Sequence, residues 1–297
     1  MAHDVDRSIT AGALARAGEI ALAAAGVPDP GRDAAALLAL ASGLSRERLH
    51  ARPDEAIGSD TRTRFRALVA RRAAREPLQH ITGTQEFWSL EFRVTPAVLI
   101  PRPETEHLIE ALQRLPLPPA PVVVDLGTGS GCLAVVAARL LPAARLVATD
   151  VSAAALEVAR DNAARHGVAD RVVFLAGDLF AALDGRGLEG GVDLLISNPP
   201  YIADSDLDGL APEVRDHEPR QALTPGPDGL AVHRRIAAGA GGFLRPGGRL
   251  LAEIGFGQEA AARAVYGAAG LAVEAIHPDL AGIARVVQAR SWCPPAV

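Results

Sequence analysis

The 297-residue sequence contains no lysine, only two cysteines, and no stretch of about 18 apolar residues. Cys132 and Cys293 are too few for a disulfide framework or a thiolate metal site. The eight histidines are scattered, and no pair has metal-ligand spacing within a helical pattern. The missing apolar stretch excludes a membrane-spanning helix. We therefore expect no metal and no membrane association, and we assign no function to the use of arginine for every basic residue.

The sequence also lacks an excess of positive charge. Its formal net charge is −5 and its pI is about 5.9, whereas proteins that bind duplex DNA normally carry a basic surface. One local exception is the segment 62–75, which carries six arginines. It is either a solvated helix face or a patch for an acidic partner or ribosomal RNA. The apolar segment 20–27 is too short for a signal peptide, so we expect a cytoplasmic protein without stable DNA binding.

The first quarter of the chain is typical of a small helical domain. Helical patterns over 8–76 are interrupted by turn-forming segments at 27–33 and 51–60. Asp33 is expected to cap a helix. Because residues 1–76 contain no cluster of reactive side chains, we predict that they form a helical substrate-recognition domain. The period-two alternation of apolar residues within 85–95 predicts a β-hairpin, which we place in a linker over 77–103.

From about residue 120 the chain alternates between strand and helix patterns. Near-continuous apolar strands that alternate with amphipathic helices favour a mostly parallel sheet covered on both faces. We therefore predict an α/β fold for residues 104–297. The expected strands are 121–126, 144–150, 171–177, 192–197, 248–254, 271–276 and 284–290.

A glycine-rich loop, DLGTGSG at 125–131, follows the first of these strands and opens a helix. Glycines let the backbone approach a ligand closely, and a helix N-terminus favours an anionic group. The spacing G-x-G-x-G differs from the dinucleotide fingerprint, because Cys132 stands where the third glycine would be. Asp150 ends the next strand, where it suits ribose hydroxyls, and Asp178 or Leu179 lines an adenine pocket. The pattern favours S-adenosylmethionine over a dinucleotide or a turn without ligand.

The strand at 192–197 ends in the sequence SNPPY. Pro199 and Pro200 remove two backbone donors and terminate the strand. The side-chain oxygen of Asn198 and the carbonyl of Pro199 are acceptors for an NH₂ group, and Tyr201 adds a flat face. These residues predict a clamp for an NH₂ attached to a π system, in which proximity and electrostatics carry catalysis. An adenine or cytosine amine and a glutamine carboxamide both suit it.

Several motifs together resemble the peptide-chain release factor glutamine methyltransferases, also called PrmC or HemK. The resemblance covers nearly the whole chain and strengthens from Pro77 onward. Asn-Pro-Pro-Tyr is shared with DNA amino-methyltransferases, whereas IPRPETE together with DLAGIARVV is much more specific. The matching segments are PLQHITGTQEFWSLEFRVTPAVLIPRPETEHLI (77–109), DLGTGSG, ATD, GDLF, SNPPYI and DLAGIARVV (279–287).

This resemblance implies a seven-stranded, Rossmann-like class I methyltransferase domain, preceded by a helical domain and a β-hairpin linker. It implies N5-methylation of the glutamine in the Gly-Gly-Gln motif of class 1 release factors, with S-adenosylmethionine as donor, S-adenosylhomocysteine as product and no metal. Leu179 stands where an aromatic residue can occur. The implied cofactor contacts are Gly127, Thr128, Gly129, Ser130, Gly131, Asp150, Asp178, Leu179 and Asn198. The implied glutamine contacts are Asn198, Pro199, Pro200 and Tyr201, of which Asn198, Pro199 and Tyr201 are the expected catalytic residues.

Three alternatives remain open on the sequence. A related group methylates a glutamine of a ribosomal protein and shares Asn-Pro-Pro-Tyr. A nucleic-acid amino-methyltransferase needs a basic groove and a base-flipping domain, and neither is visible in the sequence. The third alternative is a non-enzymatic module that binds S-adenosylmethionine or associates with translation, but this alternative does not explain the NH₂ clamp.

Overall fold

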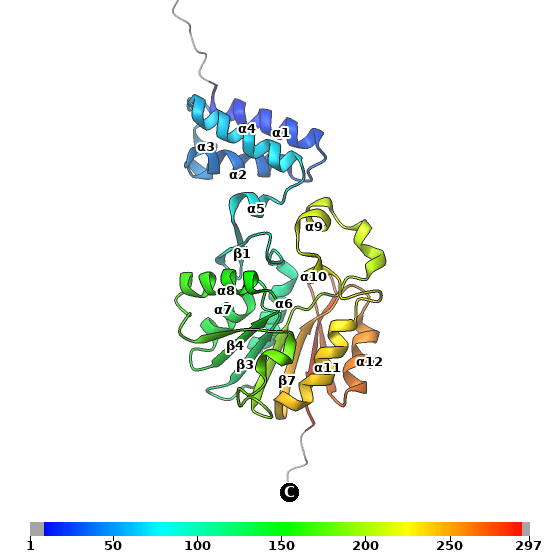
Figure 1. Cartoon of the computed structure of the whole chain (residues 1–297). Helices are drawn as coiled ribbons and strands as arrows, with labels where there is room; N and C mark the ends of the chain where they lie inside the picture. The colour runs from blue at the N-terminus through cyan, green and yellow to red at the C-terminus, as the bar shows by residue number, and fades with distance from the viewer. Residues whose placement is uncertain (1–8, 293–297) are drawn as a thin grey trace, which may run out of the picture. The chain divides into compact units, whose positions relative to one another are not determined.

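The computed structural model describes residues 9–292, which form two compact units (Figure 1). One unit contains the chain up to Gly83 together with the later segment Ala211–His217. The other contains Thr84–Leu210 and the chain from Glu218 onward. The second unit is therefore interrupted by seven residues that belong to the first.

The first unit is helical and has its own apolar core. Gly18 allows the buried Phe65 to approach α1 closely, because a Cβ at this position would lie 2.5 Å from Cζ of Phe65. Leu22 and Leu37 are fully buried in the same cluster. The helices are α1 (Ala11–Ala24), α2 (Pro30–Ser42), α3 (Arg46–Ala51), α4 (Ser59–Ala73), α5 (Leu78–Thr82) and α9 (Pro212–His217).

A network of ion pairs joins α9 to the rest of the helical unit. Arg72 of α4 donates to Asp33 at 2.8 Å and to Glu213 at 2.8 Å. Arg75 donates to both carboxylate oxygens of Glu213, at 2.8 and 2.6 Å. These hydrogen bonds hold the pKa of Glu213 down, to about 2, against the opposing effect of its burial. A buried guanidinium needs such partners, which explains why Ala211–His217 belongs to this unit.

Two expectations for the helical unit are corrected by these contacts. Asp33 is not a cap, because α2 begins earlier, at Pro30 with Asp29 in the N-cap position, and Asp33 lies inside the first turn where it pairs with Arg72. The arginine-rich segment is not a uniform solvated face. Arg72 is buried, and Arg71 and Arg75 form ion pairs with glutamates of the same unit.

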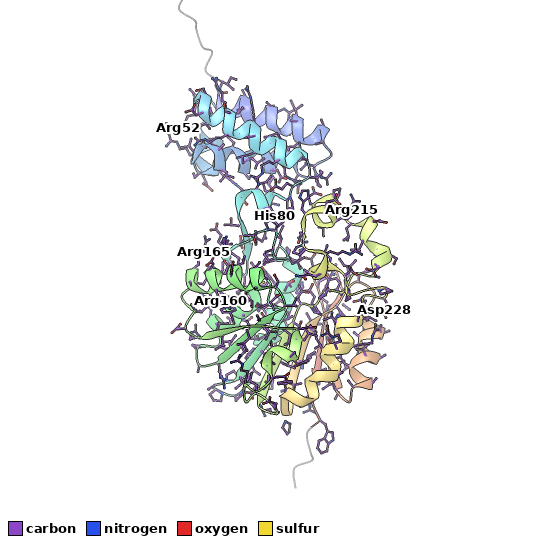
Figure 2. All side chains as sticks on the ribbon, viewed as in Figure 1. Arg52, His80, Arg160, Arg165, Arg215 and Asp228 are labelled. Carbon is purple, nitrogen blue, oxygen red and sulfur yellow. The ribbon has the colours of Figure 1, made fainter. Side chains whose placement is uncertain are left out.

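The second unit begins with the predicted hairpin, β1 (Thr84–Phe87) and β2 (Leu90–Arg93). Trp88 and Ser89 connect the two strands with φ angles of +52° and +58°, as a two-residue type I′ turn requires. Two ion pairs join β2 to α8 (Ala153–Arg165): Arg93 with Asp161, and Glu91 with Arg165, which is labelled in Figure 2.

The sheet has the order β5-β4-β3-β6-β7-β9-β8, in which the first five strands are parallel and β9 is antiparallel to both neighbours. The predicted α/β fold with a mostly parallel seven-stranded sheet is therefore confirmed. Its strands are β3 (Val122–Leu126), β4 (Arg145–Asp150), β5 (Val172–Ala176), β6 (Val192–Ser197), β7 (Leu244–Glu253), β8 (Ala272–Pro278) and β9 (Ala284–Arg290).

Helices cover both faces of this sheet (Figure 1). On one face lie α6 (Glu106–Gln113), α7 (Cys132–Leu140) and α8, and on the other α11 (Ala231–Phe243) and α12 (Glu259–Ala268). Alternate residues of the central strands enter the two cores, so the strands are apolar throughout. The shorter helices are η1 (Pro103–Thr105), η2 (Leu179–Leu183), η3 (Asp204–Gly209) and α10 (Arg220–Leu223). No helix within residues 9–292 is long and apolar enough to cross a membrane.

Candidate active site

A cavity of about 320 Å³ opens in the α/β unit at the carboxyl ends of β3, β4 and β6. The strand order reverses here, since β4 follows β3 on one side and β6 lies on the other. Ligands of open α/β sheets bind at such a switch point. The predicted site residues in its lining are Gly127, Thr128, Gly129, Ser130, Asp150, Asp178, Leu179, Asn198, Pro199 and Pro200. Gly131 and Tyr201 are outside the lining.

The glycine loop is folded onto the end of β4 by its own backbone. The N–H groups of Gly127 and Thr128 both donate to the carbonyl of Thr149, at 2.9 and 2.8 Å. The φ angles of the three glycines lie between +55° and +80°, a region that side chains other than glycine rarely adopt. Gly131 has a packing role as well, because a Cβ there would lie 2.9 Å from Cβ of Ala159. The loop thereby exposes backbone to the cavity.

Asp150 is held by both of its carboxylate oxygens. Its Oδ2 accepts from the N–H of Gly129 at 2.9 Å, and its Oδ1 accepts from the N–H of Ser152 at 2.8 Å. Burial raises the pKa of Asp150, and these backbone hydrogen bonds oppose that rise. Each carboxylate oxygen has a second lone pair. Asp150 therefore keeps acceptor capacity toward the cavity that it lines.

A second acidic residue, Asp125, lies beneath the loop and received no role in the sequence analysis. It is fully buried, and its Oδ2 accepts from the hydroxyl of Thr128 at 2.6 Å. Its Oδ1 has no hydrogen-bond partner among the described residues. Burial raises the pKa of Asp125 to about 7. The position within DLGTGSG was visible in the sequence, but its isolation from solvent was not.

Asp178 and Leu179 also line the cavity, at the start of η2. Leu179 has a φ of +51°, which is strained for a residue with a Cβ and is a feature that gathers at functional sites. Asp178 accepts from Arg235 of α11 at 2.7 Å, and both side chains line the cavity. The carboxylate of Asp178 is thus already paired, which the sequence did not indicate.

The segment Asn198–Tyr201, which we predicted to bind an NH₂ acceptor and call the acceptor motif, follows β6. That strand is buried along its whole length. The side-chain Nδ2 of Asn198 donates to Oγ1 of Thr105 at 3.0 Å. Tyr201 turns away from the cavity lining, and its hydroxyl donates to Oε1 of Glu253 at 3.1 Å. Burial raises the pKa of this hydroxyl. The carbonyl of Tyr201 accepts from Nε2 of Gln258 at 2.8 Å, so the motif is fixed at both ends.

Residues of the IPRPETE segment contact this motif and two segments on either side of it, a role that the resemblance left unassigned. Thr105 contacts Asn198, as described above. Arg102 forms an ion pair with the buried Glu218, whose other oxygen accepts from the N–H of Ile100 at 3.0 Å. Glu106 accepts from the N–H of Trp88 in the hairpin turn at 2.7 Å. The segment therefore connects the hairpin, the acceptor motif and the chain that follows it.

Metal ligands are not grouped anywhere in the part of the chain that the structure describes. No set of three or more histidine, cysteine, aspartate or glutamate side chains is arranged to hold an ion. Cys132 is buried at the start of α7, and burial raises the pKa of its thiol to about 12. A thiol that stays protonated is neither a ready ligand nor a ready nucleophile.

Two family models match the chain, and the first of them ends at Gly83, where the first segment of the helical unit ends. Residues 13–83 match the PrmC N-terminal domain, and residues 103–235 match the methyltransferase small domain. Among solved structures, a methyltransferase from Pyrococcus furiosus has a TM-score of 0.51 at 18% identity and covers 69% of this chain and 91% of that chain. At that identity the likeness concerns the fold, which is the Rossmann-like class I methyltransferase fold.

Curated relatives match over most of the chain. The release factor glutamine methyltransferase of Cereibacter sphaeroides is 49% identical over 91% of this chain and 94% of its own length. The protein of the same name from Moorella thermoacetica is 49% identical over 88% of this chain and 91% of its own length. The chain therefore belongs to the release factor glutamine methyltransferase family and is a methyltransferase.

Proposed function

We propose that this protein transfers a methyl group from S-adenosylmethionine to the side-chain N5 of the glutamine in the Gly-Gly-Gln motif of class 1 release factors. The observation that carries the proposal is that one cavity holds both the glycine loop with Asp150 and the turn Asn198–Pro200, whose two prolines have no backbone N–H. A cofactor and an NH₂ acceptor can therefore meet within it.

The cofactor half of the cavity suits S-adenosylmethionine. The free lone pairs of Asp150 would accept from the two ribose hydroxyls, the loop 127–130 would offer backbone to the amino-acid portion, and Leu179 would pack against the adenine. When bound, S-adenosylmethionine supplies an electrophilic methyl group. S-adenosylhomocysteine is the product that the same residues must release.

The acceptor half suits a carboxamide. The nitrogen of an amide is a poor nucleophile, because its lone pair is delocalised into the carbonyl. Oδ1 of Asn198 and the carbonyl of Pro199 accept the two N–H groups and hold the nitrogen in one orientation. Proximity and electrostatic preorganisation then supply the catalysis. The ring of Tyr201 supports this turn, with its hydroxyl fixed on Glu253.

We further propose that the helical unit recognises the body of the release factor. The recognition domain that we predict over 1–76 is part of this unit, which continues to Gly83 and includes Ala211–His217. The linker over 77–103 and the methyltransferase domain over 104–297 stay predictions. The helical unit offers exposed arginines on α4, namely Arg64, Arg66 and Arg71. We place this activity in the cytoplasm, where translation terminates.

The test is to locate the methyl group. The protein is incubated with labelled S-adenosylmethionine and a class 1 release factor, and the product is digested and sequenced by mass spectrometry. We expect one added methyl group on the glutamine of Gly-Gly-Gln and none on a release factor in which that glutamine is replaced. Label on a ribosomal protein or a nucleic acid instead would show that the acceptor is wrong.

A further inference from the structure

Behind the acceptor motif, polar side chains from three distant segments form one buried group. Thr105 comes from η1, Asn198 and Tyr201 follow β6, and Glu253 ends β7. Thr105 and Glu253 are 2% and 1% exposed, so neither can be satisfied by bulk water. The two hydrogen bonds that the group contains run from Asn198 to Thr105 and from Tyr201 to Glu253.

The orientation of the Asn198 amide decides what the cavity offers an acceptor. An asparagine side chain ends in an oxygen that accepts and a nitrogen that donates. Because Nδ2 donates to Thr105, Oδ1 is the end left for a ligand. If the amide were turned over, its NH₂ would face the NH₂ of the substrate, and two donors cannot bond to each other. Thr105 thus selects the useful orientation.

A hydroxyl can select this orientation only if its own hydrogen points elsewhere. Thr105 accepts from Asn198 through a lone pair, and its single hydrogen must find another acceptor. Glu253 offers such an acceptor, since its buried Oε2 has no hydrogen-bond partner among the described residues. Burial raises the pKa of Glu253, and the hydroxyls of Thr105 and Tyr201 oppose that rise because they favour its charged form.

We propose that Thr105 and Glu253 are positioning residues: Glu253 orients the Thr105 hydroxyl, which then holds the Asn198 amide with its oxygen toward the substrate nitrogen. The proposal rests on the proposed function, since it concerns how the same cavity binds an NH₂ acceptor. It adds two residues whose part is to hold another side chain: Thr105, which also lines the cavity, and Glu253, which is outside the lining. It also gives a role to the threonine of IPRPETE.

Substitutions of Thr105 separate positioning from packing. Thr105→Val keeps the shape of the side chain and removes the hydroxyl, whereas Thr105→Ser keeps the hydroxyl and removes a methyl group. A packing role predicts that serine is the worse substitution, and a positioning role predicts the reverse. Thr224→Val is the matched control, because the Thr224 hydroxyl also donates to a carboxylate, that of Asp204 at 2.8 Å, but lies outside the cavity lining.

The measurements are kcat and KM with a release factor, the dissociation constant of S-adenosylmethionine by calorimetry, and the melting temperature. We expect Thr105→Val to lower kcat by about 10–100-fold, the range found when a partner that orients a ligand is removed. Thr105→Ser should stay within about threefold of the unsubstituted protein, as should Thr224→Val. Affinity for S-adenosylmethionine should hardly change in any of the three.

Each other outcome overturns the positioning role. It fails if Thr105→Val keeps its kcat, if Thr105→Ser is as slow as Thr105→Val, or if kcat falls only in step with cofactor affinity and melting temperature. If Thr105→Val does not fold, Glu253→Gln decides the question, because a glutamine amide can donate to Thr105 and reverse its hydroxyl; unchanged kcat there also refutes the proposal. Failure of the unsubstituted protein to methylate any release factor would instead refute the proposed function.

Discussion

The two halves of the cavity are built in different ways. The cofactor half comes from one short stretch of chain, DLGTGSG, together with Asp150, which binds the N–H of Gly129 only 21 residues away. The acceptor half joins Asn198 to Thr105 across 93 residues and Tyr201 to Glu253 across 52. The contacts of the cofactor half join residues close together in the sequence, whereas those of the acceptor half join distant residues and depend on the complete fold.

This difference separates two kinds of function. The cofactor half presents backbone groups of one strand–helix turn and a carboxylate at the end of the neighbouring strand. The acceptor half must orient an amide, and this requires side chains with defined donors and acceptors on several elements. Substitutions in the acceptor half should therefore affect turnover, and those in the cofactor half should affect binding. Each of the following predictions tests this separation.

The largest effect is expected for Asn198→Ala. The substitution removes the acceptor that holds the substrate nitrogen, and we expect kcat to fall by about 10²–10³, as when one preorganised polar contact is lost from a transition state. Affinity for S-adenosylmethionine should change much less, because the glycine loop and Asp150 remain. Steady-state kinetics and calorimetry provide the two measurements.

Asn198→Asp sharpens this comparison. A carboxylate has no N–H to donate to Thr105, so the Thr105 hydroxyl would have to serve two carboxylates, the introduced one and that of Glu253, with a single hydrogen. We expect kcat to remain low although an acceptor oxygen is still present. Near-normal turnover in either variant would show that the acceptor clamp is the wrong mechanism.

A smaller effect, on stability, is expected for Glu253→Gln. Burial raises the pKa of Glu253 from its ordinary value of 4.5 to about 7. Between these pH values the unfolded chain releases a proton that the folded protein keeps, so the free energy of unfolding falls as pH rises through this window. Glutamine removes this penalty. The variant should therefore gain up to about 3 kcal/mol relative to the unsubstituted protein between pH 4.5 and pH 8.

Urea denaturation at the two pH values measures this change. Cys132, Tyr201, Glu104 and Arg285 also act electrostatically with Glu253, and Asp125 titrates near the same pH; all five remain in the variant, so the difference between the two proteins isolates Glu253. A stability difference that is independent of pH would contradict the prediction. A more stable but slower variant would show that the acceptor half sacrifices stability for orientation.

The sequence predicted well those features that depend on residues close together in the chain. Apolar periodicity and glycine punctuation located the strands of the α/β unit, and the expected 121–126 and 192–197 correspond to Val122–Leu126 and Val192–Ser197. The exception is β7, which begins at Leu244 and not at 248, across Pro246 and two glycines that do not resemble a strand. Its pairing with β6 shifts register there, which a linear pattern does not reveal.

The sequence could not predict contacts that depend on distant charges and hydroxyls. Asp33 looks like a helix cap from its neighbours, and only Arg72, 39 residues later, makes it a buried ion-pair partner. Likewise Glu213 is 138 residues from Arg75, so nothing local assigns its helix to the first unit. Thr105 and Glu253 are ordinary polar residues until the fold places them behind Asn198. The motif resemblance marked the segment of Thr105 but not that of Glu253, and it gave neither residue a role.

The smallest effect, and the mirror image of the first, is expected for Asp150→Ala. The substitution removes the acceptor for the ribose hydroxyls and also frees the N–H groups of Gly129 and Ser152. Leaving such groups without partners costs roughly 1–3 kcal/mol, so the dissociation constant of S-adenosylmethionine should rise by about 5–150-fold. At saturating cofactor, kcat should be nearly unchanged, because Asn198 and Thr105 keep their geometry. Burial raises the pKa of Asp150, which means that the charged carboxylate costs the folded protein some stability. Removing this charge should therefore lower the melting temperature less than it lowers the affinity for S-adenosylmethionine. Calorimetry that shows unchanged affinity would remove Asp150 from the cofactor half, and a fall in kcat as large as that of Asn198→Ala would show that the two halves do not act separately.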